Sequence, residues 1–264
     1  MNICKWLKTS RPRLAANRRL ALLAICCAFS ALAPPAAEAG LFSISPIRLD
    51  LDRQNKTDSI AVRNDDAEKA LTLQANLFEW KQDADGKDIY VESADLVFFP
   101  RIFTVEKQDE RVIRVGLKVP AGATEKTYRL FIEELPPPPD PQRKGAQVAF
   151  VLRFGIPIFL RPDTEQLSGS IERIEATPEG AAVTVRNSGN RNFQIQSLSF
   201  RSGAGFAKEM VGGYVLSGGT KKLTMAIPPE VCRKLGKIEI VLKSEAIGTI
   251  ERTLDWDAGR CGPK

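Results

Sequence analysis

The chain has 264 residues, a net charge of +6 and no histidine. Without histidine it cannot form a Ser-His-Asp or Cys-His catalytic group, and nearly all catalytic zinc sites are excluded as well. No carboxylate or lysine motif points to another kind of catalysis, so we expect a protein that is not an enzyme and needs no metal or cofactor.

Residues 1–39 have the three parts of a secretory signal peptide. Six basic residues are followed by an apolar run over residues 20–29. The triplet Ala37-Glu38-Ala39 then offers small residues at the two positions that a signal peptidase reads. The apolar run is short for a membrane span. We expect cleavage after Ala39 and a periplasmic protein that is not inserted in the membrane; an uncleaved N-terminal anchor is the alternative.

Most of the net charge lies in this signal. Residues 1–39 carry six basic and one acidic side chain, so the rest of the chain holds 32 basic against 31 acidic residues, a net charge of +1. A nearly neutral mature chain does not favour nucleic acid or an anionic membrane as partner. We therefore expect no nucleic-acid partner.

From residue 40 onward, short stretches of alternating apolar and polar residues are separated by turn residues. The first half of the mature chain has such stretches at residues 59–64, 71–80, 112–117 and 128–135. No long segment has the 3.6-residue period of a helix. This pattern is typical of an all-β sandwich.

The first strand changes phase at Pro46. Phe42 and Ile44 share one parity, whereas Ile47 and Leu49 share the other. A side-chain period of two cannot change phase without a bulge or a break, and proline cannot donate to a ladder. We predict an edge strand that leaves one sheet and joins the other at Pro46; an irregular N-terminal segment is the alternative.

The length of the mature chain suits two domains of about 100 residues each. A proline-rich connection at 136–141 precedes a long apolar run at 148–160. We place the first domain at 40–162 and a second, smaller β domain at 163–264, and we find no internal repeat. The second domain has predicted strands at 180–186, 194–200, 222–227 and 238–243.

Two cysteines remain after removal of the signal, Cys232 and Cys261. An even number of cysteines in an oxidising compartment predicts one disulfide bond between them. Two free, buried thiols are the alternative.

The order and spacing of several short motifs resemble the periplasmic pilus-chaperone family, of which PapD is a member, over most of residues 41–162. The motifs are SPIRL at 45–49, VRND at 62–65, LQA at 73–75 with Trp80, FFPRIF at 98–103, RVIRV at 111–115, YRLFIEELP at 128–136 and IFLRP at 158–162. The Gly-x-Pro at 155–157 is similar to the divergent, archaic-type branch. The resemblance implies two immunoglobulin-like sandwiches.

The resemblance also implies a mechanism. Such a chaperone binds pilin-like subunits that lack their last strand, lends them a strand of its own, and delivers them to an outer-membrane usher. The lent strand would be residues 146–152, with Ala146, Val148, Phe150 and Leu152 on the side that enters the subunit. An ordinary core strand is the alternative, because the other face is apolar as well.

The family binds the subunit's C-terminal carboxylate on two basic residues. Arg48 falls on the position of the first, and a guanidinium fork suits a carboxylate. The second, a lysine in the family, falls on Pro157 here. Arg153 has the same parity four residues earlier, so we predict it as the replacement.

Two other classes of function stay open at this point. One is a structural or adhesive surface protein built from the same sandwiches. The other is a carbohydrate-binding or hydrolytic sandwich, which would have clustered exposed tryptophans or paired carboxylates; the mature chain has only Trp80 and Trp256.

Overall fold

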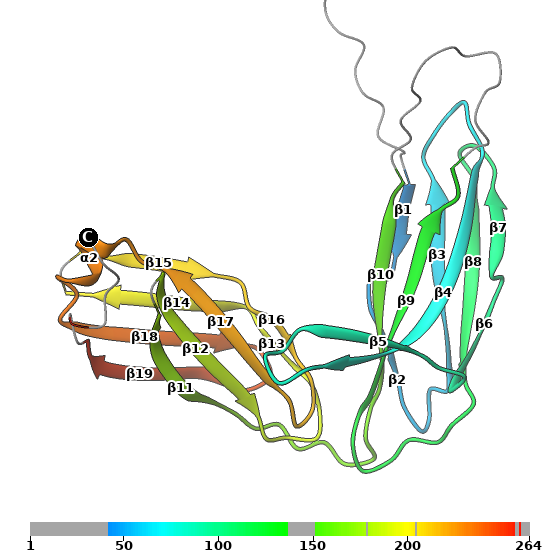
Figure 1. Ribbon diagram of the computed structural model, residues 1–264. Helices are drawn as coiled ribbons and strands as arrows, with labels where there is room; N and C mark the ends of the chain where they lie inside the picture. The colour runs from blue at the N-terminus through cyan, green and yellow to red at the C-terminus, as the bar shows by residue number, and fades with distance from the viewer. Residues whose placement is uncertain (1–41, 137–150, 178, 204, 257–258, 260–264) are drawn as a thin grey trace, which may run out of the picture. The chain divides into compact units, whose positions relative to one another are not determined.

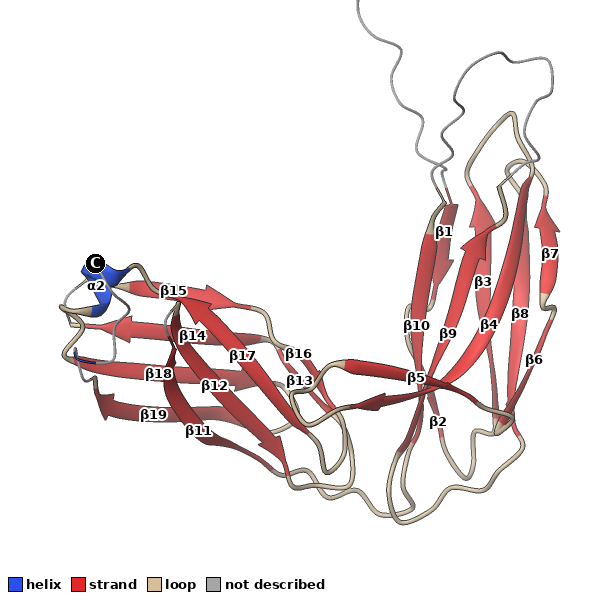
Figure 2. Cartoon of the chain, in the orientation of Figure 1, coloured by secondary structure: helices blue, strands red, loops and turns tan. Residues whose placement is uncertain are grey.

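The computed structural model describes residues 42–136, 151–177, 179–203, 205–256 and 259 (Figure 1). Residues 40–264 form one compact unit. Within the described residues this unit consists of strands and a single short helix, α2 (Pro229–Cys232) (Figure 2). The prediction of an all-β chain is therefore confirmed.

The first sandwich has two sheets, and its strands alternate between residues that face the other sheet and residues that face solvent. One sheet has four strands in the order β1 (Phe42–Ser45), β3 (Thr57–Asn64), β8 (Glu110–Leu117), β6 (Leu96–Phe99). The other has the order β2 (Leu49–Leu51), β10 (Arg153–Leu160), β9 (Lys126–Glu134), β4 (Leu71–Gln82), β5 (Asp88–Glu92), and β7 (Ile102–Val105) also pairs with β4.

The core of this sandwich is formed by the inward-facing residues of both sheets. Ile60, Ile113, Leu130 and Ile158 are completely buried in it. Each such side chain contributes about 1.5–3 kcal/mol through burial. The outward-facing residues of β9 and β10 are consequently left for other contacts, and they form the site described below.

The predicted change of sheet at Pro46 is confirmed. Strand β1 pairs with β3 in the four-stranded sheet, with Phe42 opposite Asn64. Strand β2 pairs in parallel with the end of β10, with Leu49 opposite Ile158. The chain therefore crosses between the sheets over residues 46–48, which places Arg48 immediately before β2.

The second sandwich encloses a separate core of buried residues. Its sheets are β11 (Gly169–Thr177), β12 (Gly180–Asn187), β17 (Thr220–Ala226); β13 (Phe193–Ile195), β16 (Gly213–Val215); and β15 (Ala207–Met210), β14 (Ser197–Ser202), β18 (Lys237–Ser244), β19 (Gly248–Asp255). The predicted boundary at 162/163 falls between β10 and β11, and as a boundary between domains it stays a prediction.

Two predicted strands differ from the structure. The expected strand at 194–200 is wrong: Phe193 and Ile195 belong to β13, whereas Leu198 and Phe200 belong to β14 in another sheet. Those two pairs are buried with opposite parity, so the chain changes sheet between them as it does at Pro46. The run predicted at 148–160 is a strand from Arg153 onward, and its residues 148–150 lie outside the described residues.

The two sandwiches share one short motif at the end of a strand. Asn64 ends β3 and Asn187 ends β12, each as the third residue of Val-Arg-Asn, and both are buried. The Asn64 amide donates to the carbonyls of Lys69, Val105 and Glu106 at 2.8–3.2 Å. The Asn187 amide donates to the carbonyls of Arg191 and Val215 at 2.8 and 3.1 Å. Each asparagine thus satisfies main-chain groups where the chain leaves the sheet.

The predicted disulfide stays a prediction, because Cys261 lies outside the described residues. Cys232 is buried at the end of α2. Its Sγ accepts a hydrogen bond from Trp256 Nε1 at 3.3 Å. This contact connects the helix to the end of the last described strand.

Replacing Asn64 or Asn187 with alanine should lower the free energy of unfolding by about 1–3 kcal/mol, because buried carbonyls lose their donor. Urea unfolding measures the change. Asn55→Ala is the matched control, since Asn55 is exposed and its side-chain amide donates to Asp52; it should change stability by less than about 0.5 kcal/mol. A loss no larger than that of the control would contradict the capping role.

Candidate functional site

The outer face of the six-stranded sheet carries basic side chains around Pro157. Pro157 lies opposite Arg129 of β9. On its other side, continuing the β2–β10 register by one residue places Arg48 next to Pro157. Because neighbouring strands lie about 4.8 Å apart, the Cα atoms of Arg48 and Arg129 are about 10 Å apart, on either side of Pro157.

Arg48 is oriented by a carboxylate and an aromatic ring. Its Nε and Nη2 donate to the two oxygens of Asp50 at 2.7 Å each. The guanidinium lies 4.3 Å from the centroid of Phe159 and 5.9 Å from that of Tyr214. Two of its three guanidinium nitrogens are therefore used on Asp50.

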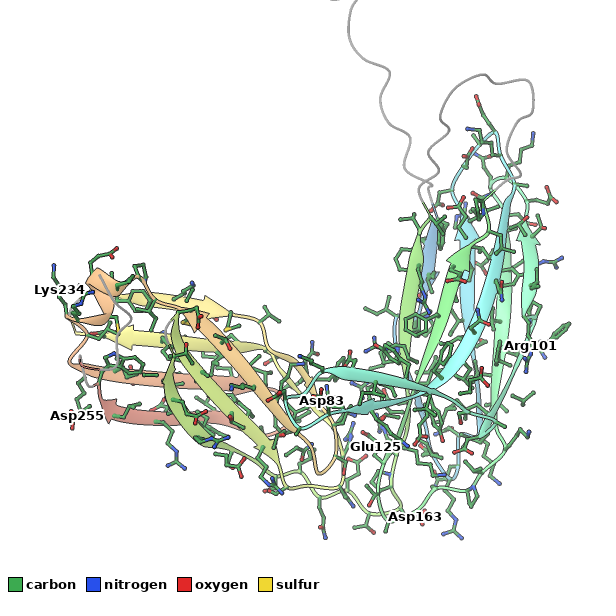
Figure 3. All side chains as sticks on the ribbon, in the orientation of Figure 1. Asp83, Arg101, Glu125, Asp163, Lys234 and Asp255 are labelled. Carbon is green, nitrogen blue, oxygen red and sulfur yellow. The ribbon has the colours of Figure 1, made fainter. Side chains whose placement is uncertain are left out.

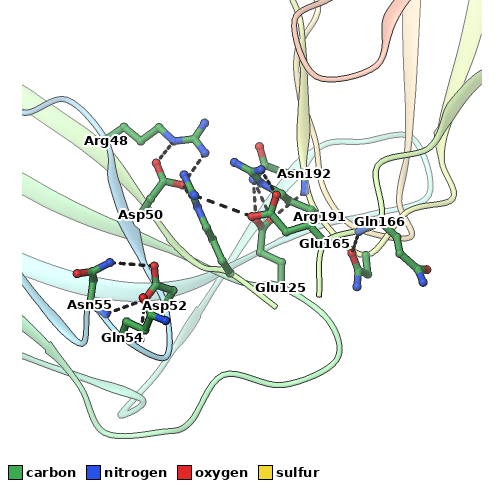
Figure 4. Close-up of polar contacts among 12 residues, drawn as sticks. Arg48, Asp50, Asp52, Gln54, Asn55, Glu125, Glu165, Gln166, Arg191 and Asn192 are labelled. Atoms are coloured by element: carbon green, nitrogen blue, oxygen red, sulfur yellow. Dashed lines mark hydrogen bonds and ion pairs between the residues drawn. The ribbon is translucent and has the colours of Figure 1, made fainter. Parts of the chain in front are cut away.

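A chain of alternating charges extends from Arg48, as Figure 4 shows. Asp50 accepts a second hydrogen bond from Arg161 Nε at 3.3 Å. Arg161 lies 3.9 Å from Glu165, which also pairs with Arg191. Asp50 bonds to both Arg48 and Arg161. Its single negative charge therefore orients Arg48 without cancelling the positive charge of the two arginines together.

The protonation states of this pair are fixed at neutral pH. Burial lowers the pKa of Arg48, but the hydrogen bond and charge of Asp50 outweigh it, and the net shift is upward. Burial raises the pKa of Asp50, but Arg48 and then Arg161 outweigh it, and the net shift is downward. Both groups remain charged.

Arg129 is the second cation of the site, and it is not among the residues predicted from the sequence. Its guanidinium lies 4.0 Å from the centroid of the Trp80 ring, and its Nη1 donates to the carbonyl of Gly155 at 3.0 Å. Its Nε is buried and has no hydrogen-bond partner among the described residues. The stacking orients the charge without neutralising it. Only the strand register, which the sequence does not reveal, places Arg129 beside Pro157.

The structure does not bring Arg153 to Arg48. Arg153 lies four residues before Pro157 on β10, about 13 Å along the strand. Its Nε lies 3.4 Å from Glu133, and its guanidinium stacks 3.9 Å from the centroid of Phe131. The role of Arg153 as the second cation for a carboxylate stays a prediction, and the distance of Arg153 from Pro157 does not favour it.

Strand β10 has an open edge beside Arg48. Its residues 158–160 pair with β2, whereas no described strand pairs with that same edge over residues 153–157. Leu152, just before the strand, packs against the core of the first sandwich. Of the predicted donor residues, Ala146, Val148 and Phe150 lie outside the described residues. An open edge presents main-chain donors and acceptors that a strand of another chain can pair with.

Glu125, immediately before β9, is a buried carboxylate that contacts the second sandwich. Its oxygens accept hydrogen bonds from the main-chain N of Asn192 at 2.9 Å and from its Nδ2 at 2.8 Å. Burial raises the pKa of Glu125 to about 6, and the hydrogen bonds from Asn192 and the charges of Arg191 and Arg48 counteract only part of this.

No group of side chains in the described residues has the composition of a metal site. The described part of the chain also contains no helix that is long and apolar enough to cross a membrane.

One family model matches the chain. Residues 41–166 match the family described as pili and flagellar-assembly chaperone, PapD N-terminal domain. No curated protein matches. The resemblance inferred from the motifs is thereby confirmed.

Solved structures with the same fold cover both sandwiches. The chain is similar to the CsuC–CsuE chaperone–tip adhesion subunit pre-assembly complex from archaic chaperone–usher Csu pili of Acinetobacter baumannii, with 22% identity, TM-score 0.57, and 80% of this chain and 97% of that chain covered. The Salmonella enterica SafA pilin in complex with the SafB chaperone has 17% identity and a TM-score of 0.53, with 83% of this chain and 98% of that chain covered. The Pseudomonas aeruginosa CupB2 chaperone has 16% identity and a TM-score of 0.52, with 81% of this chain and 100% of that chain covered. The fold is therefore that of two immunoglobulin-like sandwiches, as expected.

The raised pKa of Glu125 predicts a stability that depends on pH. The folded state disfavours the charged form of Glu125. The resulting destabilisation of the folded protein is absent below about pH 4.5, grows between pH 4.5 and 6, and is complete above pH 6. Relative to Glu125→Gln, the wild-type protein should gain about 2 kcal/mol of stability when the pH falls from 7 to 4.5. Urea unfolding at both pH values measures this difference. An identical pH dependence in the two proteins would contradict the buried charge.

Proposed function

Because residues 41–166 belong to the PapD N-terminal domain family of pilus and flagellar-assembly chaperones, we propose that this chain binds, folds and stabilises pilin-like subunits. It lends them a strand in the periplasm, after cleavage of the signal peptide, and delivers them to an outer-membrane usher. The work is done by binding, without catalysis or a cofactor, and the folding of the subunit drives its capture.

The observation that carries this proposal is the open edge of β10 that ends beside two oriented cations. Val151 and Phe154 at this edge are 48% and 40% exposed. A partner strand that pairs there can extend along residues 151–157, a distance of about 23 Å. Its end would then lie beside Arg48, with Arg129 on the far side of Pro157.

The placement of the cations determines the direction of the bound strand. Arg48 lies at the end of the open edge that is nearer to the C-terminus of β10. If the subunit's terminal carboxylate binds there, the rest of its last strand runs back toward Leu152. The subunit strand is then parallel to β10.

The two arginines are suited to a carboxylate for different reasons. Arg48 is held in place by Asp50 through Nε and Nη2, whereas Arg129 is held by the Trp80 ring and by one hydrogen bond from Nη1 to the carbonyl of Gly155. A carboxylate offers two oxygens with four lone-pair positions, enough for both guanidinium groups. The partly buried position strengthens these charge-assisted bonds relative to water.

The strand to be lent precedes β10. We propose that Ala146, Val148, Phe150 and Leu152 enter the groove of the subunit left by its missing strand. Two of the solved structures with this fold are complexes of a chaperone with a tip adhesion subunit and with a pilin. That likeness supports a subunit as the partner.

Arg48→Ala and Arg129→Ala should each weaken subunit binding at least tenfold, because the buried carboxylate loses a charged partner. Arg153→Ala should weaken it less than threefold, because Arg153 is far from Pro157. Relative affinity is measured by competition between each variant and tagged wild-type chaperone for one co-expressed pilin-like subunit. Full subunit affinity in Arg48→Ala would rule out Arg48 as a carboxylate anchor. A loss of affinity in Arg153→Ala but not in Arg129→Ala would favour Arg153, as predicted from the sequence, as the second cation.

Phe150→Asp should abolish subunit capture while leaving the chaperone folded, because a carboxylate in an apolar groove costs several kcal/mol. Val151→Asp, on the opposite side of the chain, is the matched control and should retain the subunit. Co-purification of the subunit from the periplasm is the measurement. Wild-type yield with Phe150→Asp would show that this segment is not the lent strand.

A further inference from the structure

We propose that the turn between β4 and β5 is a clasp that holds Tyr214 of the second sandwich against Arg48, so that the second sandwich completes the carboxylate site. The clasp consists of residues 82–86. This inference rests on the proposed function, because it assigns Gln82 and Gly86 as positioning residues for the same site.

Gln82, the last residue of β4, binds the second sandwich as a neighbouring strand would. Its Nε2 donates to the carbonyl of Tyr214 at 3.1 Å, and its Oε1 accepts a hydrogen bond from the main-chain N of Leu216 at 3.0 Å. One side-chain amide thus pairs with both main-chain groups on either side of Val215. Tyr214 is held at its backbone, which restricts where its ring can lie.

The turn that follows makes two further contacts through its main chain. The carbonyl of Asp85 accepts a hydrogen bond from the main-chain N of Lys222 at 3.0 Å. The carbonyl of Ala84 accepts one from Thr220 Oγ1 at 2.7 Å. Figure 3 labels Asp83 at the tip of this hairpin. The clasp therefore contacts both β16 and β17.

Gly86 allows this close approach. Its φ is +80°, a region that favours glycine, and a Cβ there would lie 2.7 Å from Lys221 Cα and 2.8 Å from the Thr220 carbonyl oxygen. Asp83 fixes the turn internally, since its Oδ1 accepts hydrogen bonds from the main-chain N of Asp85 and of Lys87 at 2.9 Å. The turn is thus shaped before it meets the second sandwich.

The ring that the clasp positions is part of the anchor's aromatic support. The centroid of Tyr214 lies 5.5 Å from that of Trp80 and 5.5 Å from that of Phe159. Those are the rings on which Arg129 and Arg48 stack. Trp80, Phe159 and Leu216 form a small buried cluster against which Tyr214 packs. Loss of the clasp frees Tyr214 and loosens the support of both cations.

Three variants test the clasp: Gln82→Leu, Thr220→Val and Gly86→Ala. Gln74→Leu is the matched control, because Gln74 lies on the same strand and its side chain donates to Asn76 Oδ1 at 3.4 Å, away from the second sandwich. Spin labels on cysteines placed at the exposed positions Lys107 and Lys237 report the distance between the sandwiches. The same proteins are compared for subunit affinity by the competition measurement described above.

We expect the clasp variants to broaden the distance distribution and to lower subunit affinity about fivefold or more, whereas Gln74→Leu changes neither. Tyr214→Ala should lower affinity without broadening the distribution to the same extent. Unchanged distances and affinity in folded Gln82→Leu and Thr220→Val would overturn the inference. If Arg48→Ala also kept full affinity, the proposed function would fail as well; if Arg48→Ala lost affinity, the clasp alone would be wrong.

Discussion

The short pairing between β2 and β10 is the constraint on which the site depends. The chain changes sheet between Ser45 and Leu49, so only the last three residues of β10 gain a parallel partner. The remaining edge is left open in the described residues. The same change of sheet delivers Arg48 to the end of that edge. One feature of the backbone therefore creates both the open edge and the positive charge beside the end of that edge.

The cations of the site remain charged and available because other groups orient them only in part. Asp50 accepts hydrogen bonds from two nitrogens of Arg48, but the negative charge of Asp50 also pairs with Arg161. Arg129 is held by the face of Trp80 and one carbonyl. Such partial neutralisation holds long, flexible side chains in one geometry, which reduces the entropy lost when a ligand binds. It also avoids a fully satisfied ion pair that a ligand would have to break.

The sequence predicted what depends on local pattern. Alternation revealed the all-β class, and the parity change at Pro46 revealed the change of sheet. It did not reveal strand β5, because all its residues are exposed and no burial pattern marks it. It also pointed to Arg153 through parity within one strand. Arg129 is adjacent to Pro157 only through the antiparallel register of β9 and β10, a long-range property that no local pattern contains.

The central claim is that Arg48 binds the terminal carboxylate of a subunit strand, and a double-mutant cycle tests it most directly. One change is Arg48→Ala; the other extends the subunit by two glycines, which moves its carboxylate away from the anchor. Subunit affinity is measured for all four combinations. Each single change should weaken binding at least tenfold, and the double change should be little worse than either alone, since both remove one interaction. Additive losses would contradict the claim.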